Sequence, residues 1–114
     1  MDELKNGTAA APVMALIVAG GRGERLGGPV AKQYQTLAGI PVLRHALLAF
    51  CHHPAIAGVA AVIRADDQSH YEEAAHGLDL LPPIIGGASR QQSVLRGLQG
   101  LAPLAPARVL IHDG

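Results

Sequence analysis

The stretch VMALIVAGGRGERLGGPVAKQY, Val13–Tyr34, joins an apolar run to a loop that contains five glycines, two arginines and a lysine. Residues 13–19 are apolar without alternation, which is typical of a strand buried on both faces of a parallel sheet. A glycine-rich loop directly after such a strand is a common position for phosphate binding in α/β proteins. The stretch therefore predicts an α/β fold with an anion-binding loop at the end of its first strand.

Strand-like and helix-like segments alternate along the rest of the chain. We expect Pro41 at the first position of one helix, Asp66 or Asp67 at the start of the next, and Ser89 as the cap of a third. Gly77 should end the second of these helices. Strands that alternate with helices imply a doubly wound, mostly parallel sheet in a three-layer α/β/α arrangement. The expected strands are 13–19, 58–63, 82–87 and 107–113, and the expected helices are 41–53, 66–76 and 90–101.

Composition limits the functions that the chain can have. Nine basic residues balance nine acidic ones, so no overall field attracts nucleic acid or an anionic membrane. The single Cys51 excludes an internal disulfide framework and favours a cytoplasmic protein. Apolar runs are shorter than the roughly 18 residues that a membrane span needs. We therefore expect a cytoplasmic enzyme without nucleic-acid or membrane partners.

The two ends of the chain carry further expectations. Residues 1–12 lack the basic start and apolar core of a signal peptide, and we expect a disordered leader there. The sequence stops at Gly114, directly after its fourth predicted strand, where a doubly wound sheet normally continues. We therefore expect residues 13–114 to be the N-terminal part of a single domain, truncated after that strand.

The loop follows neither of two well-known phosphate-binding patterns. A dinucleotide fingerprint that starts at Gly21 needs a glycine where Leu26 stands. A Walker A pattern that starts at Gly23 reaches Gly28 but continues with Pro29 instead of lysine. The spacing alone does not name a substrate.

The residue types in the loop still suit a triphosphate. Glycines within 20–23 allow backbone N–H groups to approach an anion without a Cβ in the way. Arg22, Arg25 and Lys32 add full positive charges that can neutralise phosphate oxygens. Spacing alone leaves a tight turn with solvated charges as an equal alternative.

Three segments resemble the 2-C-methyl-D-erythritol 4-phosphate cytidylyltransferase family of the non-mevalonate isoprenoid pathway. They are AGGRGERLGGPVAKQY (19–34), GGASRQQSVLRGL (86–98) and VLIHDG (109–114), in the family's order. The resemblance implies a Rossmann-like nucleotidyltransferase fold and transfer of a cytidylyl group from CTP to the polyol phosphate, with release of pyrophosphate. Members are typically homodimers, and some are fused to the cyclodiphosphate synthase of the same pathway. The second segment is similar to the sequence of these fused forms.

The resemblance also implies residue roles. Arg25 and Lys32 match the catalytic residues that stabilise charge on the α-phosphate, a role that suits nucleotidyl transfer. Asp113 matches the aspartate that binds Mg²⁺ or another divalent cation, and a helix cap is its alternative reading. The residues that match the nucleotide-binding positions are Ala19, Gly20, Gly21, Arg22, Gly23, Gly86, Gly87, Arg90 and Ser93.

One departure affects the expected base pocket. Gly86, Gly87 and Ser93 match the segment around the cytosine, where small residues allow close approach and a hydroxyl can satisfy a base edge. Some relatives carry aspartate at the position of Ala88, so base selectivity would rest on the remaining residues, with Arg90 and Gln92 helping to shape the pocket.

Two alternatives of different class stay open. One is another transferase with the same loop, acting on ribitol phosphate or a sugar phosphate. The other is a non-catalytic nucleotide-binding domain, against which the retention of both Arg25 and Lys32 argues.

Overall fold

The computed structural model of the chain describes residues 12–19, 34–37 and 40–114. Its main sheet has four parallel strands in the order β5-β4-β1-β6, and β2 and β3 form a separate antiparallel pair. The strands are β1 Val13–Ala19, β2 Thr36–Leu37, β3 Ile40–Pro41, β4 Gly58–Ile63, β5 Ile84–Ile85 and β6 Arg108–Asp113. The helices are α1 Val42–Cys51, α2 Gln68–Ala75 and α3 Arg90–Leu101, with 3₁₀ turns at Ala65–Asp67 and Ala102–Leu104.

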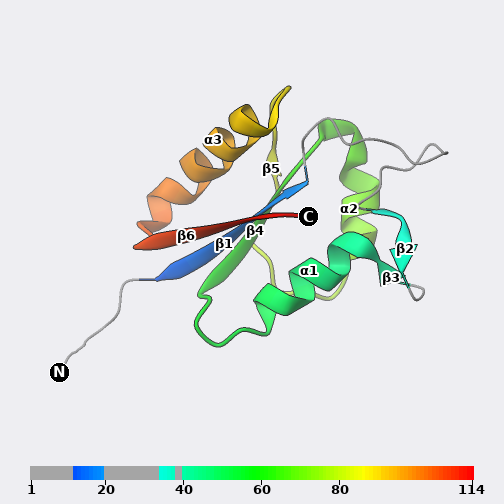
Figure 1. Cartoon of the computed structure of the whole chain (residues 1–114), viewed down its shortest axis with the longest axis horizontal. Helices are drawn as coiled ribbons and strands as arrows, with labels where there is room; N and C mark the ends of the chain where they lie inside the picture. The colour runs from blue at the N-terminus through cyan, green and yellow to red at the C-terminus, as the bar shows by residue number, and fades with distance from the viewer. Residues whose placement is uncertain (1–11, 20–33, 38–39) are drawn as a thin grey trace.

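Helices cover both faces of the sheet (Figure 1). Successive side chains of a strand point to opposite faces, so β1 contributes to two cores. Ala15 and Ile17 pack with Leu43 and Leu47 on the side of α1 and α2. Leu16 belongs to the second core, which lies under α3. The expected α/β fold with a parallel sheet between helical layers is confirmed.

Gly97 allows α3 to lie close against the sheet. A Cβ atom at this position would stand 2.5 Å from Cδ2 of Leu16 and 2.9 Å from Cγ2 of Val62. These contacts are closer than packed carbon atoms tolerate. The missing side chain therefore sets the distance between the helix and the strands, and with it the position of the first turn of α3.

Two of the expected helix boundaries are confirmed. The Ser89 hydroxyl accepts the backbone N–H of Gln92 at 3.1 Å, which caps α3. Gly77 follows α2 with a φ of 79°, a conformation that glycine adopts without a steric cost.

The boundary at Pro41 differs from the expectation, whereas Asp67 is the N-cap residue of α2, as expected, but without the side-chain bond. Pro41 is not the first helical residue: it pairs with Thr36 in β3, its ψ of 139° is extended, and α1 begins at Val42. A 3₁₀ turn takes up Asp66, so α2 starts at Gln68. Asp67 precedes this helix without a side-chain capping bond.

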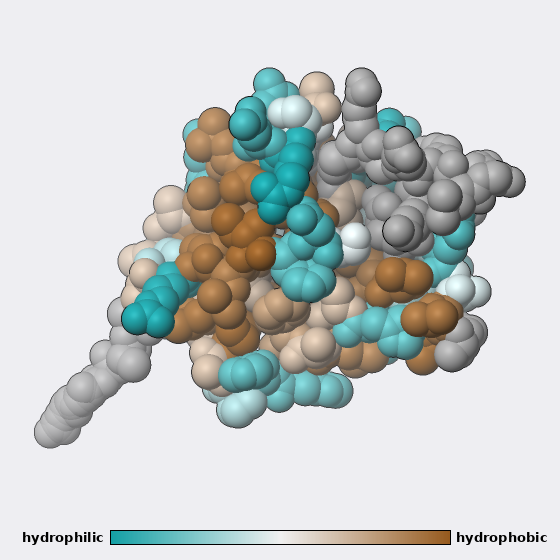
Figure 2. Space-filling view, viewed as in Figure 1, coloured by the Kyte–Doolittle hydropathy of each residue, from teal (hydrophilic) through white to brown (hydrophobic). Residues whose placement is uncertain are grey.

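Apolar side chains remain exposed on one part of the surface. Figure 2 shows hydrophobic residues gathered over α3 and the neighbouring β6. The exposed large hydrophobic residues include Leu95 and Leu98 of α3, and Leu104 just beyond the helix. In the described parts of the chain, the helices are too short or too polar to cross a membrane.

Candidate functional site

The carboxyl ends of the four parallel strands meet at one edge of the sheet. Ala19 of β1 pairs with Ile63 of β4, Ile63 pairs with Ile85 of β5, and Val18 of β1 pairs with Asp113 of β6. Ligands of open α/β sheets bind beyond this edge. Ala19 at the end of β1, the turn after β5 and the end of β6 all lie at this edge, as the sequence predicted.

Part of the predicted site lies outside the described residues. Ala19 is described and is buried at the end of β1. The predicted residues of the segment 20–33, whose roles therefore stay predictions, are Gly20, Gly21, Arg22, Gly23, Arg25 and Lys32.

Tyr34, the first described residue after the segment 20–33, is packed against α2. Its side chain is buried, and its ring stacks on His70 of α2 with centroids 5.5 Å apart. Burial raises the pKa of Tyr34 well above its ordinary value, and the Asp67 carboxylate adds to this effect. The carbonyl of Gln35 accepts the backbone N–H of Val42 at 2.8 Å. The exit of the loop segment is thus fixed to the starts of α1 and α2.

The turn 86–89 is held by side chains of the helix that follows it. The hydroxyl of Ser93, which is buried, accepts the backbone N–H of Gly87 at 3.2 Å. Oε1 of Gln92 accepts the backbone N–H of Ala88 at 2.8 Å. Ser93 therefore holds the backbone of the turn from its buried side, while its own O–H can still donate a hydrogen bond. Its contact with a base stays a prediction.

Arg96 holds the same turn, a role that the sequence analysis did not predict. Its Nη1 atom donates to the carbonyl of Gly86 at 3.0 Å, and the N–H of Gly86 donates to the carbonyl of Ile63 at 2.8 Å. Positions 89, 92, 93 and 96 share one helical face, so their spacing could have indicated a common role. The last residue of β4 and the first two turns of α3 thereby fix the backbone at Gly86.

Arg90 and Asp113 bring two of the three sequence motifs into contact. Nε of Arg90, the first residue of α3, lies 2.9 Å from Oδ1 of Asp113 at the end of β6. The two side chains are 56% and 66% exposed. The first turn of α3 has no acidic residue of its own, so Asp113 supplies the negative charge at this point.

A divalent cation fits this carboxylate only with help from other ligands. Within the described residues, no three His, Cys, Asp or Glu side chains come together as a metal-binding group. Mg²⁺ is usually held by one or two carboxylates together with the phosphates of a substrate. Oδ1 of Asp113 is paired with Arg90, and cation binding by this carboxylate stays a prediction.

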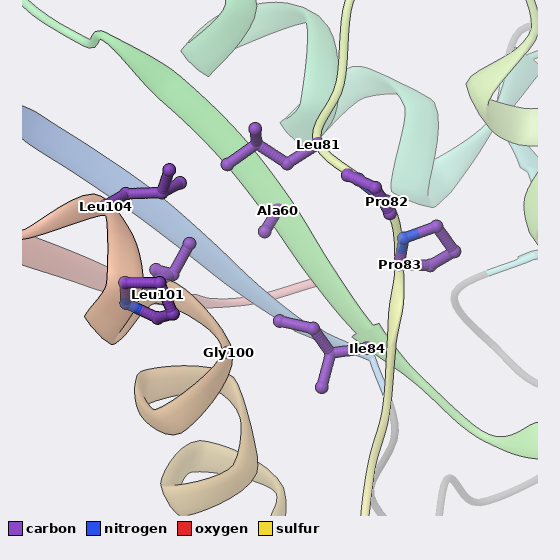
Figure 3. Close-up of a pocket in the computed structure, with 9 residues that line it drawn as sticks. Ala60, Leu81, Pro82, Pro83, Ile84, Gly100, Leu101 and Leu104 are labelled. Atoms are coloured by element: carbon purple, nitrogen blue, oxygen red, sulfur yellow. The ribbon is translucent and has the colours of Figure 1, made fainter.

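A groove at the other end of α3 is separate from these residues (Figure 3). It has a volume of about 340 Å³ and an apolar lining that includes Ala60, Leu81, Ile84, Leu101 and Leu104. None of the predicted site residues that the structure describes lines it, and the described residues of its lining carry no charged side chain. The groove therefore plays no part in the candidate site.

Comparison with known proteins gives the family of this chain. The family model for IspD, 2-C-methyl-D-erythritol 4-phosphate cytidylyltransferase, matches residues 13–114. Bifunctional enzymes IspD/IspF from Rhodospirillum rubrum and Paramagnetospirillum magneticum are 56% and 55% identical over 105 and 104 residues. These alignments cover 91% of this chain and 27% of each relative, so the chain spans about a quarter of their length.

A solved structure shares the fold. The crystal structure of 4-diphosphocytidyl-2C-methyl-D-erythritol synthase from Anaerococcus prevotii matches with a TM-score of 0.69 and 25% sequence identity. The match covers 90% of this chain and 43% of that protein. With a family match over nearly its whole length, the chain belongs to the 2-C-methyl-D-erythritol 4-phosphate cytidylyltransferase (IspD) family.

Proposed function

We propose that the complete protein transfers a cytidylyl group from CTP to 2-C-methyl-D-erythritol 4-phosphate, and that this chain forms the nucleotide side of the site. A phosphate oxygen of the polyol phosphate attacks the α-phosphorus of CTP. The bond between that phosphorus and the bridging oxygen to the β-phosphate breaks. The products are 4-diphosphocytidyl-2-C-methyl-D-erythritol and pyrophosphate.

The convergence of three motifs at one sheet edge carries this proposal. Ala19, the turn 86–89 and Asp113 lie at the same edge of the sheet because β1, β4, β5 and β6 are parallel. A nucleotide bound across this edge would contact all three at once. A fold-level likeness alone would not bring these particular residue types together.

The proposed roles follow the chemistry of each group. Backbone N–H groups of the segment 20–23 bind the triphosphate, and Arg25 and Lys32 stabilise the charge that develops on the α-phosphate. Asp113 holds a divalent cation, which supplies a Lewis acid for the phosphate oxygens when it is bound. Arg22 contributes positive charge to the same loop.

The turn 86–89 is proposed to face the cytosine. Its two glycines lie against Ser93 and Gln92, where a Cβ would stand 2.5 Å from each of these side chains. Its backbone is held by Ser93, Gln92 and Arg96. Ala88 places no carboxylate beside the base, so recognition rests on backbone groups and on the hydroxyl of Ser93. A rigid backbone can distinguish a pyrimidine from a purine by shape and by its hydrogen-bonding groups.

Further properties of the complete protein are proposed on the family resemblance. They are a Mg²⁺ cofactor, a homodimer and a cytoplasmic location, with residues 1–12 as a leader and 13–114 as part of one nucleotidyltransferase domain. The two bifunctional relatives support a second, IspF-like part in the complete protein.

Pyrophosphate release tests the proposed substrates. The complete protein is assayed with Mg²⁺ and CTP, UTP, ATP or GTP, with and without 2-C-methyl-D-erythritol 4-phosphate. We expect release only when CTP and this acceptor are both present. Release with ribitol phosphate or a sugar phosphate instead would assign a different transferase, and no release with any pair would indicate a nucleotide-binding domain without activity.

A further inference from the structure

The pairing of Arg90 with Asp113 raises a question about how a cation reaches this carboxylate. Nε of Arg90 lies 2.9 Å from Oδ1 of Asp113, so a guanidinium already neutralises the group that is proposed to bind metal. The two residues are 23 positions apart and come from different elements, α3 and β6. Their contact is therefore a product of the fold, and not of local sequence.

The register of β6 explains why the two residues meet. Val109 packs in the core under α3, and side chains at every second position of a strand share a face. Asp113 therefore lies on the α3 side, whereas His112 contacts Phe50 of α1 on the other side. The Ser89 cap fixes the start of α3 and so places Arg90 opposite this end of β6.

The charge of Arg90 determines whether Asp113 binds a free divalent cation or a cation that is already bound to a nucleotide. A free divalent cation that approaches Asp113 is repelled by the guanidinium beside it. A cation bound to a triphosphate arrives as a net anion, which attracts Arg90. The guanidinium can then exchange the carboxylate for phosphate oxygens, with which it forms strong, directional hydrogen bonds. Both side chains are more than half exposed, so this exchange leaves no buried charge unpaired.

We propose that Arg90 keeps Asp113 paired until a nucleotide arrives and then contacts its phosphate oxygens, so that the divalent cation binds together with its nucleotide and not before it. The proposal rests on the proposed function of Asp113 as a cation ligand. It assigns to Arg90 a role in the order of binding, in place of a contact with the base.

Binding of Mn²⁺ without nucleotide tests this directly, because it requires no turnover. Free Mn²⁺ is measured by electron paramagnetic resonance during titration of the complete protein. We expect Arg90→Gln to bind Mn²⁺ roughly tenfold more tightly than the wild type, because one repelling charge is gone. Arg90→Lys, which keeps that charge, should bind as weakly as the wild type.

Two controls identify the site. The double variant Arg90→Gln/Asp113→Asn should lose the added affinity, because the carboxylate is absent. Arg108→Gln removes an exposed arginine from the other end of β6 and should leave Mn²⁺ affinity unchanged. Thermal unfolding of each variant establishes that it is folded.

A second titration concerns the nucleotide. With CTP present and no acceptor, Arg90→Gln should bind CTP with Mn²⁺ roughly tenfold more weakly, since a phosphate partner is lost. An unchanged or weaker affinity of Arg90→Gln for free Mn²⁺, or an added affinity that survives in the double variant, would overturn the proposal. Absence of pyrophosphate release by the wild type would instead contradict the proposed function, while leaving the Mn²⁺ titrations interpretable.

Discussion

The buried hydroxyl of Ser93 accepts the backbone N–H of Gly87 at 3.2 Å, so the second turn of α3 fixes the turn that precedes the helix. A Cβ atom at Gly86 would lie 2.5 Å from the same hydroxyl oxygen. The serine and the two glycines thus fit one another closely. This relationship joins the stability of the helix to the shape of the proposed base pocket.

Ser93→Ala removes the acceptor for the Gly87 N–H, which is partly buried. We expect a loss of about 1 kcal/mol in the free energy of unfolding, together with a raised KM for CTP. Urea unfolding and steady-state kinetics measure the two effects. Ser69→Ala, at an exposed position on α2, is the matched control and should change neither. A Ser93→Ala variant as stable as this control would show that the hydrogen bond contributes nothing.

Gly97→Ala places a methyl group within 2.5 Å of Leu16 and forces α3 away from the sheet. Alanine favours a helix over glycine by about 1 kcal/mol, but overpacking in a core typically costs about 1–3 kcal/mol. We therefore expect a net loss of stability in chemical denaturation. Gly100→Ala, whose methyl would meet only the end of the Ile84 side chain, should be clearly less destabilising.

Arg44 of α1 ties down the end of α2. Its Nη1 atom donates to the carbonyl of Ala74 at 2.9 Å and to that of His76 at 2.8 Å. We expect Arg44→Ala to lower the free energy of unfolding by about 1.5–3 kcal/mol, the range for hydrogen bonds from a charged donor. Arg64→Ala removes an exposed ion pair with Asp66, so it should cost less than about 1 kcal/mol. Equal effects of the two substitutions would contradict this account.

Tyr71 should make the protein sensitive to alkaline pH. Burial raises the pKa of Tyr71 from 10.0 to about 12. Because the unfolded chain releases this proton at lower pH than the folded chain, stability is complete below pH 10 and falls as the pH rises toward 12. The melting temperature of Tyr71→Phe should therefore decline less steeply over this range than that of the wild type.

The same variant tests the buried hydroxyl itself. The hydroxyl oxygen of Tyr71 is buried and has no hydrogen-bond partner among the described residues, so replacing the residue with Phe should leave stability at neutral pH unchanged or raised. A marked loss of stability at pH 7 would show that the hydroxyl has a partner in solution.

The main elements could be predicted because their signals are strong. A strand buried on both faces, such as β1, is continuously apolar, and Ser89 and Gly77 mark helix ends through their own chemistry. The pair β2 and β3 was missed because strands of two residues carry no periodicity. Pro41 was misplaced by one position because the same residue also suits the extended backbone before a helix.

The sequence predicted which segments form the candidate site but not which side chains are in contact there. The order of motifs placed the turn 86–89 and Asp113 at the same edge. The sequence could not show that Arg90 pairs with Asp113, because their contact depends on where α3 lies over β6. Nor could it show that the hydroxyl of Ser93 bonds to the turn, since a position in a helix alone does not reveal which residues pack against it.

Formation of the cytidine diphosphate product shows whether this chain supplies the nucleotide side of a cytidylyl transfer site. The complete protein is incubated with CTP, 2-C-methyl-D-erythritol 4-phosphate and Mg²⁺, and the cytidine diphosphate product is quantified for the wild type, Lys32→Ala and Lys5→Ala. The last variant removes the same charge from the expected leader. The account predicts product from the wild type and Lys5→Ala, and a loss of about a hundredfold to a thousandfold in kcat for Lys32→Ala. No product from the wild type, or equal rates for the two lysine variants, would contradict it.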